Sequence, residues 1–215
     1  MTHPPEPWIL HGQTYVSVWA VPRAALPPLP AGPTRTIRPV TLGGRGLLGV
    51  TWAVYEPGGV LHYREVLAAV LVRAGLRPRV SVTHAWVDSP VARDGGRELW
   101  GIPKEPAELT VTVDGDTSAV SARTAAGSVA RALLRPRHRL PGRWPIRFTV
   151  VQQLGARTRS TPVQCRAGLA TADATWEVEP ASPLGHLAGR RPLLTVRLHD
   201  VRLVFGATAR ASHRR

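Results

Sequence analysis

Short segments in which apolar and polar residues alternate recur along this chain, and glycine or proline separates them. Alternation with a period of two is typical of strands that bury one face, whereas helices repeat every 3.6 residues. The strand-like segments do not alternate regularly with helical ones, so the pattern predicts one mainly antiparallel β domain spanning residues 1–215, with one or two short helices. The predicted strands cover residues 15–21, 47–55, 79–87, 109–113, 119–124, 148–152, 163–170 and 193–205.

Local signals add detail to this pattern. Asp114-Gly115 between two strand-like runs predicts a tight hairpin. Ser89-Pro90 is typical of a helix start, and the two glycines that follow at 95 and 96 are expected to keep that helix short. Residues 63–75 fit either a buried strand or one short helix, and residues 193–205 fit two strands or one bent strand.

Composition is typical of a folded, soluble chain. Of the 215 residues, 43% are hydrophobic, which is ample for a core. The longest apolar run, residues 66–72, is far below the roughly 20 residues that span a bilayer, and the first residues do not resemble a signal peptide. A single cysteine, Cys165, excludes an internal disulfide framework. We therefore expect a cytoplasmic protein without membrane contact.

The net charge of +14 suggests an anionic partner at first sight. Six arginines lie in residues 131–147 and could contact phosphates. However, the chain carries no RNA- or DNA-binding motif, and its aromatic residues do not form a stacking cluster. We do not expect a nucleic-acid partner, and residues 131–147 are interpreted as a solvated loop or a charged rim at a subunit contact.

Motifs for cofactors and metals are weak. Residues 44–49 match G-x-G-x-x-G, but a strand-like segment follows where a dinucleotide site needs a helix. No two of the eight histidines are closer than eight residues, so metal-ligand spacing is absent. Cys165 lies among polar residues without a sign of activation. We expect no cofactor and no metal.

The lysine content is the most informative part of the composition. Of the 28 basic residues, 27 are arginine and one, Lys104, is lysine. Lys104 follows Pro103 and precedes Glu105-Pro106, and residues before proline favour extended backbone. In an extended segment, Lys104 shares a face with Ile102 while Glu105 points away. The pattern therefore predicts an amine on an apolar face.

An amine in such surroundings has a specific chemistry. Burial generally disfavours the ammonium form of an amine, so a neutral nucleophile becomes available. That nucleophile attacks a ketone to form an imine, which accepts electrons released by loss of CO₂ or of a proton. A nearby carboxyl group must then move protons. A lysine on the surface of a proline-flanked loop is the alternative interpretation.

The residues around Lys104 resemble the acetoacetate decarboxylase superfamily. The similarity centres on G-R-E-L-x-x-x-P-K at residues 96–104, which follows a strand ending at Asp88. Residues 52–59, which contain Tyr55-Glu56, look like the family's Tyr-x-Glu or Tyr-Glu loop. Residues 10–15 look like its first strand, and residues 183–205 are similar to its closing strand pair. The resemblance implies an antiparallel, cone-shaped β barrel, commonly assembled as a homo-oligomer.

The resemblance also implies roles for individual residues. Lys104 would be the Schiff-base nucleophile and Glu56 the acid/base group, acting on a keto acid or a related carbonyl compound. Gln13, Arg97 and Trp100 are weaker candidates for the substrate pocket or its support, and Arg97 could instead pair with Glu98 or Glu56. We expect a lyase that performs decarboxylation or aldol/dehydration-type chemistry.

Two departures from the family pattern keep an alternative open. The decarboxylases carry a second lysine where this chain has Glu105, and an arginine near the first strand where this chain has Gln13. These departures favour a non-catalytic small-molecule-binding or accessory protein on the same scaffold. The sequence leaves the substrate and the oligomeric state undetermined.

Overall fold

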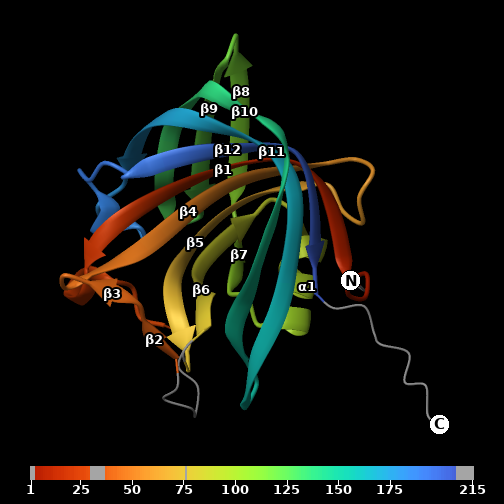
Figure 1. The fold of residues 1–215 in the computed structure, drawn as a ribbon, viewed down its shortest axis with the longest axis vertical. Helices are drawn as coiled ribbons and strands as arrows, with labels where there is room; N and C mark the ends of the chain where they lie inside the picture. The colour runs from red at the N-terminus through yellow and green to blue at the C-terminus, as the bar shows by residue number, and fades with distance from the viewer. Residues whose placement is uncertain (1–2, 30–36, 76, 207–215) are drawn as a thin grey trace.

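A computed structural model describes residues 3–29, 37–75 and 77–206, and strands dominate it (Figure 1). The predicted mainly β fold is confirmed. The described residues form one α-helix, α1 (Pro90–Trp100), and two 3₁₀ turns, η1 (Arg23–Ala25) and η2 (Gly185–Leu187). The strands are β1 (Trp8–Pro22), β2 (Ile37–Pro39), β3 (Thr41–Leu42), β4 (Arg45–Glu56), β5 (Tyr63–Ala74), β6 (Arg77–Val87), β7 (Lys104–Pro106), β8 (Glu108–Asp114), β9 (Thr117–Thr124), β10 (Gly127–Leu154), β11 (Arg157–Val178) and β12 (Leu194–Phe205).

The strands form one sheet that curls back on itself. Neighbouring strands follow the order β7-β6-β5-β4-β1-β12-β11-β10-β9-β8, and most pairs are antiparallel. A further contact between β6 and β10, at Val80 and Val150, joins the two parts of this path, which is consistent with the predicted architecture. The buried amide of Gln152 strengthens this contact, because it exchanges hydrogen bonds with the Val82 backbone at 2.8 and 2.9 Å.

The two faces of the central strands bury different clusters. Successive residues of a strand point to opposite faces, and directly paired residues share a face. Trp52 on β4 pairs with Val66 on β5, and both pack against β8, β9 and the start of β10. On the other face, Tyr63 packs in a separate cluster with residues of helix α1. The central strands therefore separate these two apolar clusters.

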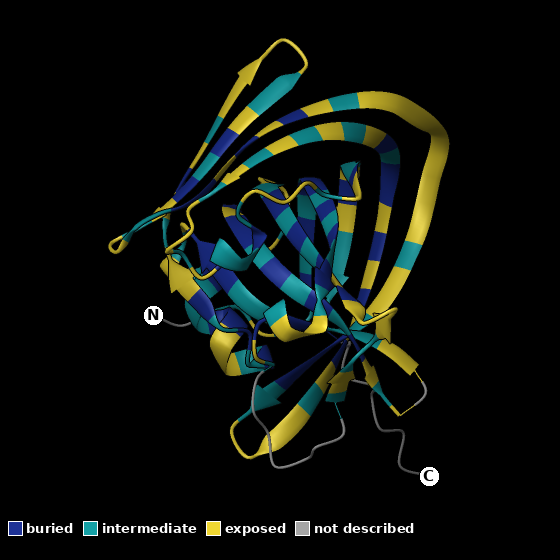
Figure 2. Ribbon diagram, turned by 90° about the vertical axis from the view of Figure 1, so that its left-hand side faces the viewer, coloured by how far each residue is buried: buried dark blue, intermediate teal, exposed yellow. Residues whose placement is uncertain are grey.

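The hairpin of β10 and β11 corrects the prediction for residues 131–147. This stretch is strand rather than loop, paired with β11 and exposed over most of its length (Figures 1 and 2). Three prolines, at 136, 141 and 145, made the segment look irregular. Between residue 135 and residue 149, β10 pairs with β11 on one side only among the described residues, and such an edge tolerates residues that lack an N–H group.

Most of the other local predictions are confirmed. Of the two alternatives for residues 63–75, the strand is correct, since β5 covers Tyr63–Ala74, and Asp114-Gly115 leads into the turn between β8 and β9. Residues 193–205 form one strand with an irregularity near Asp200, where φ is 51°. The G-x-G-x-x-G segment leads into strand β4 rather than a helix. In the described residues, no helix has the length and apolar character needed to cross a membrane.

Candidate active site

Helix α1 and the extended segment after it determine the position of Lys104. Ser89 caps the helix by accepting a hydrogen bond from the Ala92 N–H at 3.3 Å, with Pro90 in the first turn. The helix continues through both glycines to Trp100 and has 11 residues, so it is short, as expected. Gly101 ends it in left-handed conformation, with φ of 69°. The chain then becomes extended, and β7 places Lys104 beside Ala85 of β6.

The Lys104 amine is buried in an ion pair. Lys104 is 3% exposed, and its Nζ lies 2.9 Å from Oε1 of Glu65, which is equally buried. Nζ also donates a hydrogen bond to the Tyr63 hydroxyl oxygen at 3.3 Å. The rings of Tyr63 and Trp8 lie 5.0 and 5.9 Å from Nζ. An amine, a carboxylate and a phenol therefore meet inside an otherwise apolar cluster.

The two tyrosines of the site keep their protons. Burial, followed by the negative charge of Glu65, raises the pKa of Tyr63 well above its usual value. The same two causes raise the pKa of Tyr55, whose ring centroid lies 4.8 Å from that of Tyr63. The Tyr63 hydroxyl can therefore donate to Oε2 of Glu65, at 3.4 Å, while it accepts from Lys104. This arrangement links the amine to the carboxylate twice, directly and through Tyr63.

Gly96 provides the space for the lysine side chain. A Cβ atom at this helical position would lie 2.6 Å from Cδ and 2.7 Å from Cε of Lys104, closer than carbon atoms approach. Gly95 has a similar role toward the Trp8 ring, which a Cβ atom would meet at 2.4 Å. Close packing therefore explains why two glycines are tolerated in the middle of a short helix.

We expect the Gly96→Ala variant to lose about 1–3 kcal/mol of unfolding free energy, because the added methyl group overpacks the site against Lys104. Chemical denaturation measures this loss. Gly49→Ala is the matched control, since its Cβ would meet only Ser17 O at 3.9 Å. In a Lys104→Ala background, Gly96→Ala should cost little, because the clashing atoms are gone. An equal loss in both backgrounds would contradict this explanation.

The side chains around Lys104 point in the predicted directions. Ile102 and Lys104 are buried whereas Glu105 is exposed. Arg97 forms an ion pair with Glu105, and its Nε donates to the Lys104 carbonyl oxygen at 2.6 Å. Arg97 therefore supports β7 from outside and neutralises the neighbouring anion. Its partner is Glu105 rather than Glu98 or Glu56.

The carboxylate that meets Lys104 is not the expected one. Glu56 is exposed at the end of β4, and alternation turns it to the sheet face opposite Tyr55 and Glu65. Among the described residues, Glu65 lies within ion-pair distance of Lys104. A signal for Glu65 was present in the sequence, because Tyr63-Arg64-Glu65 matches Tyr-x-Glu whereas Tyr55-Glu56 lacks the intervening residue.

The other two predicted site residues lie outside the contacts of Lys104. Trp100 is buried, donates through Nε1 to Glu6 Oε2 at 2.8 Å, and packs edge-on against Trp8 at 4.8 Å. It therefore supports Trp8, which covers the amine and which the sequence did not single out. Gln13 accepts a hydrogen bond from Arg197 Nη2 at 2.8 Å, on the opposite face of the sheet.

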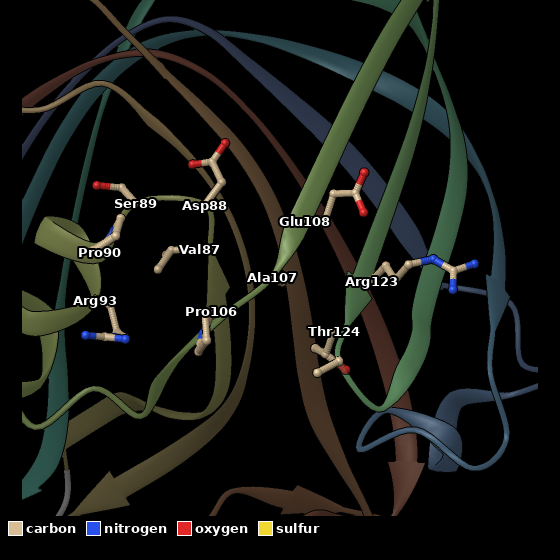
Figure 3. A pocket seen from close by; sticks show the side chains of 11 residues that line it. Val87, Asp88, Ser89, Pro90, Arg93, Pro106, Ala107, Glu108, Arg123 and Thr124 are labelled. Carbon is tan, nitrogen blue, oxygen red and sulfur yellow. The ribbon is translucent and has the colours of Figure 1, made fainter.

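An open hollow of about 460 Å³ lies between the start of α1 and the β8–β9 hairpin (Figure 3). Two of its charged residues are engaged elsewhere, since Asp88 pairs with Arg64 and Arg93 pairs with Asp94. Pro106, two residues after Lys104, lines this hollow, but the buried amine does not. The hollow is therefore separate from the candidate site as the structure shows it.

The sequence pattern of the acetoacetate decarboxylase family, described as "Acetoacetate decarboxylase (ADC)", matches residues 29–151, more than half of the chain. The chain belongs to this family. The match includes Lys104, Glu65 and Tyr63, and it confirms the resemblance drawn from residues 96–104. No curated protein sequence matches the chain.

Several solved structures share the fold of this chain. The acetoacetate decarboxylase of Legionella pneumophila subsp. pneumophila str. Philadelphia 1 is 16% identical, with a TM-score of 0.69 over 96% of this chain and 87% of that one. An acetoacetate decarboxylase-like enzyme from Sphingomonas wittichii RW1 is 16% identical, with a TM-score of 0.62 over 94% and 91%. The enduracididine biosynthesis enzyme MppR, complexed with pyruvate, is 19% identical, with a TM-score of 0.58 over 95% and 88%.

Proposed function

We propose that this family member is a Schiff-base-forming lyase that acts on a small keto acid. The observation that carries the proposal is the buried contact of 2.9 Å between the amine of the only lysine and the carboxylate of Glu65. Imine chemistry requires both a nucleophilic amine and a group that moves protons beside it, and these two residues supply both.

The first step is attack on the carbonyl carbon. Glu65 takes a proton from the Lys104 ammonium, and the free amine then bonds to the carbonyl carbon of the substrate. Loss of the carbonyl oxygen as water leaves an imine, which is protonated on nitrogen. Tyr63 holds its proton and can donate a hydrogen bond to the departing oxygen, because its hydroxyl lies next to Nζ.

The second step releases electrons into the imine. From a β-keto acid, the bond to the carboxylate breaks, CO₂ leaves, and its electron pair forms an enamine. From pyruvate, Glu65 removes a proton from the methyl carbon to give the same kind of enamine. Protonation of that carbon and addition of water then release the product and regenerate the Lys104 amine. The enamine can instead attack an aldehyde, which is the aldol outcome.

Similar proteins support this substrate class. MppR has been solved in complex with pyruvate and with the condensation product of pyruvate and imidazole 4-carboxaldehyde. One ground for the non-catalytic alternative is also weaker, because Glu105 faces away from the amine and pairs with Arg97.

Exchange of the pyruvate methyl protons in D₂O tests this proposal. If Lys104 and Glu65 cycle pyruvate through an enamine, NMR should show enzyme-dependent loss of the methyl proton signal. Release of CO₂ from acetoacetate, corrected for the spontaneous reaction, tests the decarboxylation branch in parallel. Absence of both activities would favour a binding protein on the same scaffold.

A further inference from the structure

A second cavity of about 220 Å³ lies on the sheet face opposite Lys104. Its floor comes from β1, β4 and β12, and its mouth from the hairpin of β8 and β9. The lining residues that carry the argument are Gln13, Tyr15, Trp52, Asp116 and Arg197. Unlike the hollow beside α1, this cavity has buried polar groups without partners.

Two N–H groups of this cavity are unsatisfied. Trp52 is 2% exposed, and its Nε1 has no hydrogen-bond partner among the described residues. The buried Nε of Arg197 is also without a partner in the described part of the chain. Each unsatisfied buried donor costs about 1–3 kcal/mol, and native proteins contain few of them. Two unsatisfied N–H donors on residues that line one small cavity indicate that a bound ligand provides the hydrogen-bond acceptor.

The arginine is held in place for such an acceptor. Arg197 Nη2 donates to Gln13 Oε1 at 2.8 Å, and the guanidinium lies 5.7 Å from the centre of the Tyr15 ring. These contacts hold the guanidinium in place, while its buried Nε has no hydrogen-bond partner among the described residues. A guanidinium edge beside a second N–H donor matches a carboxylate, which accepts two parallel hydrogen bonds.

The sheet separates this cavity from the candidate active site. Tyr15 pairs with Trp52, and Trp52 pairs with Val66, so these three side chains share one face. Glu65 is the next residue along β5 and therefore points to the other face, toward Lys104. A molecule in the cavity cannot reach the Lys104 amine through the intervening strands.

We propose that this cavity is a second binding site for a small monocarboxylate, held by Arg197 and Trp52. The volume suits a ligand of a few heavy atoms. Asp116 at the mouth is the other charged residue among those that line the cavity, and it disfavours a second negative charge on the ligand. The ligand does not need a carbonyl group, because no amine faces it. This inference is independent of the proposed lyase function.

Indole resonances test the site directly. Propionate, which cannot form an imine, is titrated into protein labelled with ¹⁵N-tryptophan, and the Trp52 N–H signal is assigned from its absence in Trp52→Phe. We expect a saturable shift of that signal. Propionamide, which has the same shape without the charge, should bind at least 10-fold more weakly.

Variants locate the binding. Arg197→Gln should weaken propionate binding at least 10-fold, while Arg202→Gln, an exposed arginine of the same strand, should leave it unchanged. Calorimetry on Trp52→Phe should show several-fold weaker binding of propionate. This variant tests the site a second time, in case Arg197→Gln misfolds. The double variant Lys104→Met/Glu65→Gln, which removes the amine without leaving an unpaired buried carboxylate, should have no effect. An unshifted Trp52 signal, equal binding to Arg197→Gln, or loss of binding in this double variant would overturn the proposal.

Discussion

Lys104→Met loses methyl proton exchange on pyruvate and CO₂ release from acetoacetate by more than about 10⁴-fold, since the nucleophile is gone and no other lysine can replace it. The measurement is the initial rate of each reaction under saturating substrate. A variant that retains more than a tenth of either rate would show that the chemistry does not pass through this amine.

Folding must be controlled in this experiment. Lys104→Met leaves Glu65 as an unpaired buried carboxylate, and removal of one partner from a buried ion pair costs about 3–5 kcal/mol. The double variant Lys104→Met/Glu65→Gln removes that charge as well, so it should recover most of the lost stability while remaining inactive. Thermal unfolding of the single and double variants separates the two effects.

Glu65→Gln should lower the rate of methyl proton exchange by about 10²–10⁴-fold, because the amide cannot accept the proton that leaves the substrate carbon. It should still form the imine, although more slowly, since the Lys104 amine is intact. Exchange is measured by NMR and imine formation by reductive trapping. If exchange and trapping fell by the same factor, Glu65 would act on the amine alone.

Glu56→Gln is the matched control for Glu65→Gln. The two carboxylates lie on consecutive strands, but Glu56 is exposed and on the other face of the sheet. We expect Glu56→Gln to retain the exchange rate within about two-fold, since a surface carboxylate contributes little to a buried site. Loss of exchange in Glu56→Gln with retention in Glu65→Gln would return the acid/base role to Glu56.

The sequence was most informative where one face of a strand is buried. Alternation and turn residues predicted β4 and the β8–β9 hairpin, because burial on one side dictates a period of two. The middle of β10 could not be predicted in this way. It is exposed on both faces and contains prolines, so neither periodicity nor composition distinguishes it from a loop.

The candidate site was predictable only in part. Lys104 was evident because it is unique and because the prolines beside it set its facing. Its carboxylate partner depends on which face of the sheet each glutamate occupies, and that depends on strand register. The ambiguity of residues 63–75 left this register open, and the resemblance at Tyr55-Glu56 pointed to Glu56 alone. Trp8 reaches the amine through tertiary packing, which the sequence around Trp8 does not predict.

Reductive trapping followed by peptide mapping tests the central claim most directly. The protein is incubated with pyruvate or acetoacetate and then with borohydride, which converts an imine into a stable secondary amine. The account predicts one adduct per chain, located on Lys104 and absent from Lys104→Met. No adduct with either keto acid, or an adduct confined to the N-terminal amine, would contradict it.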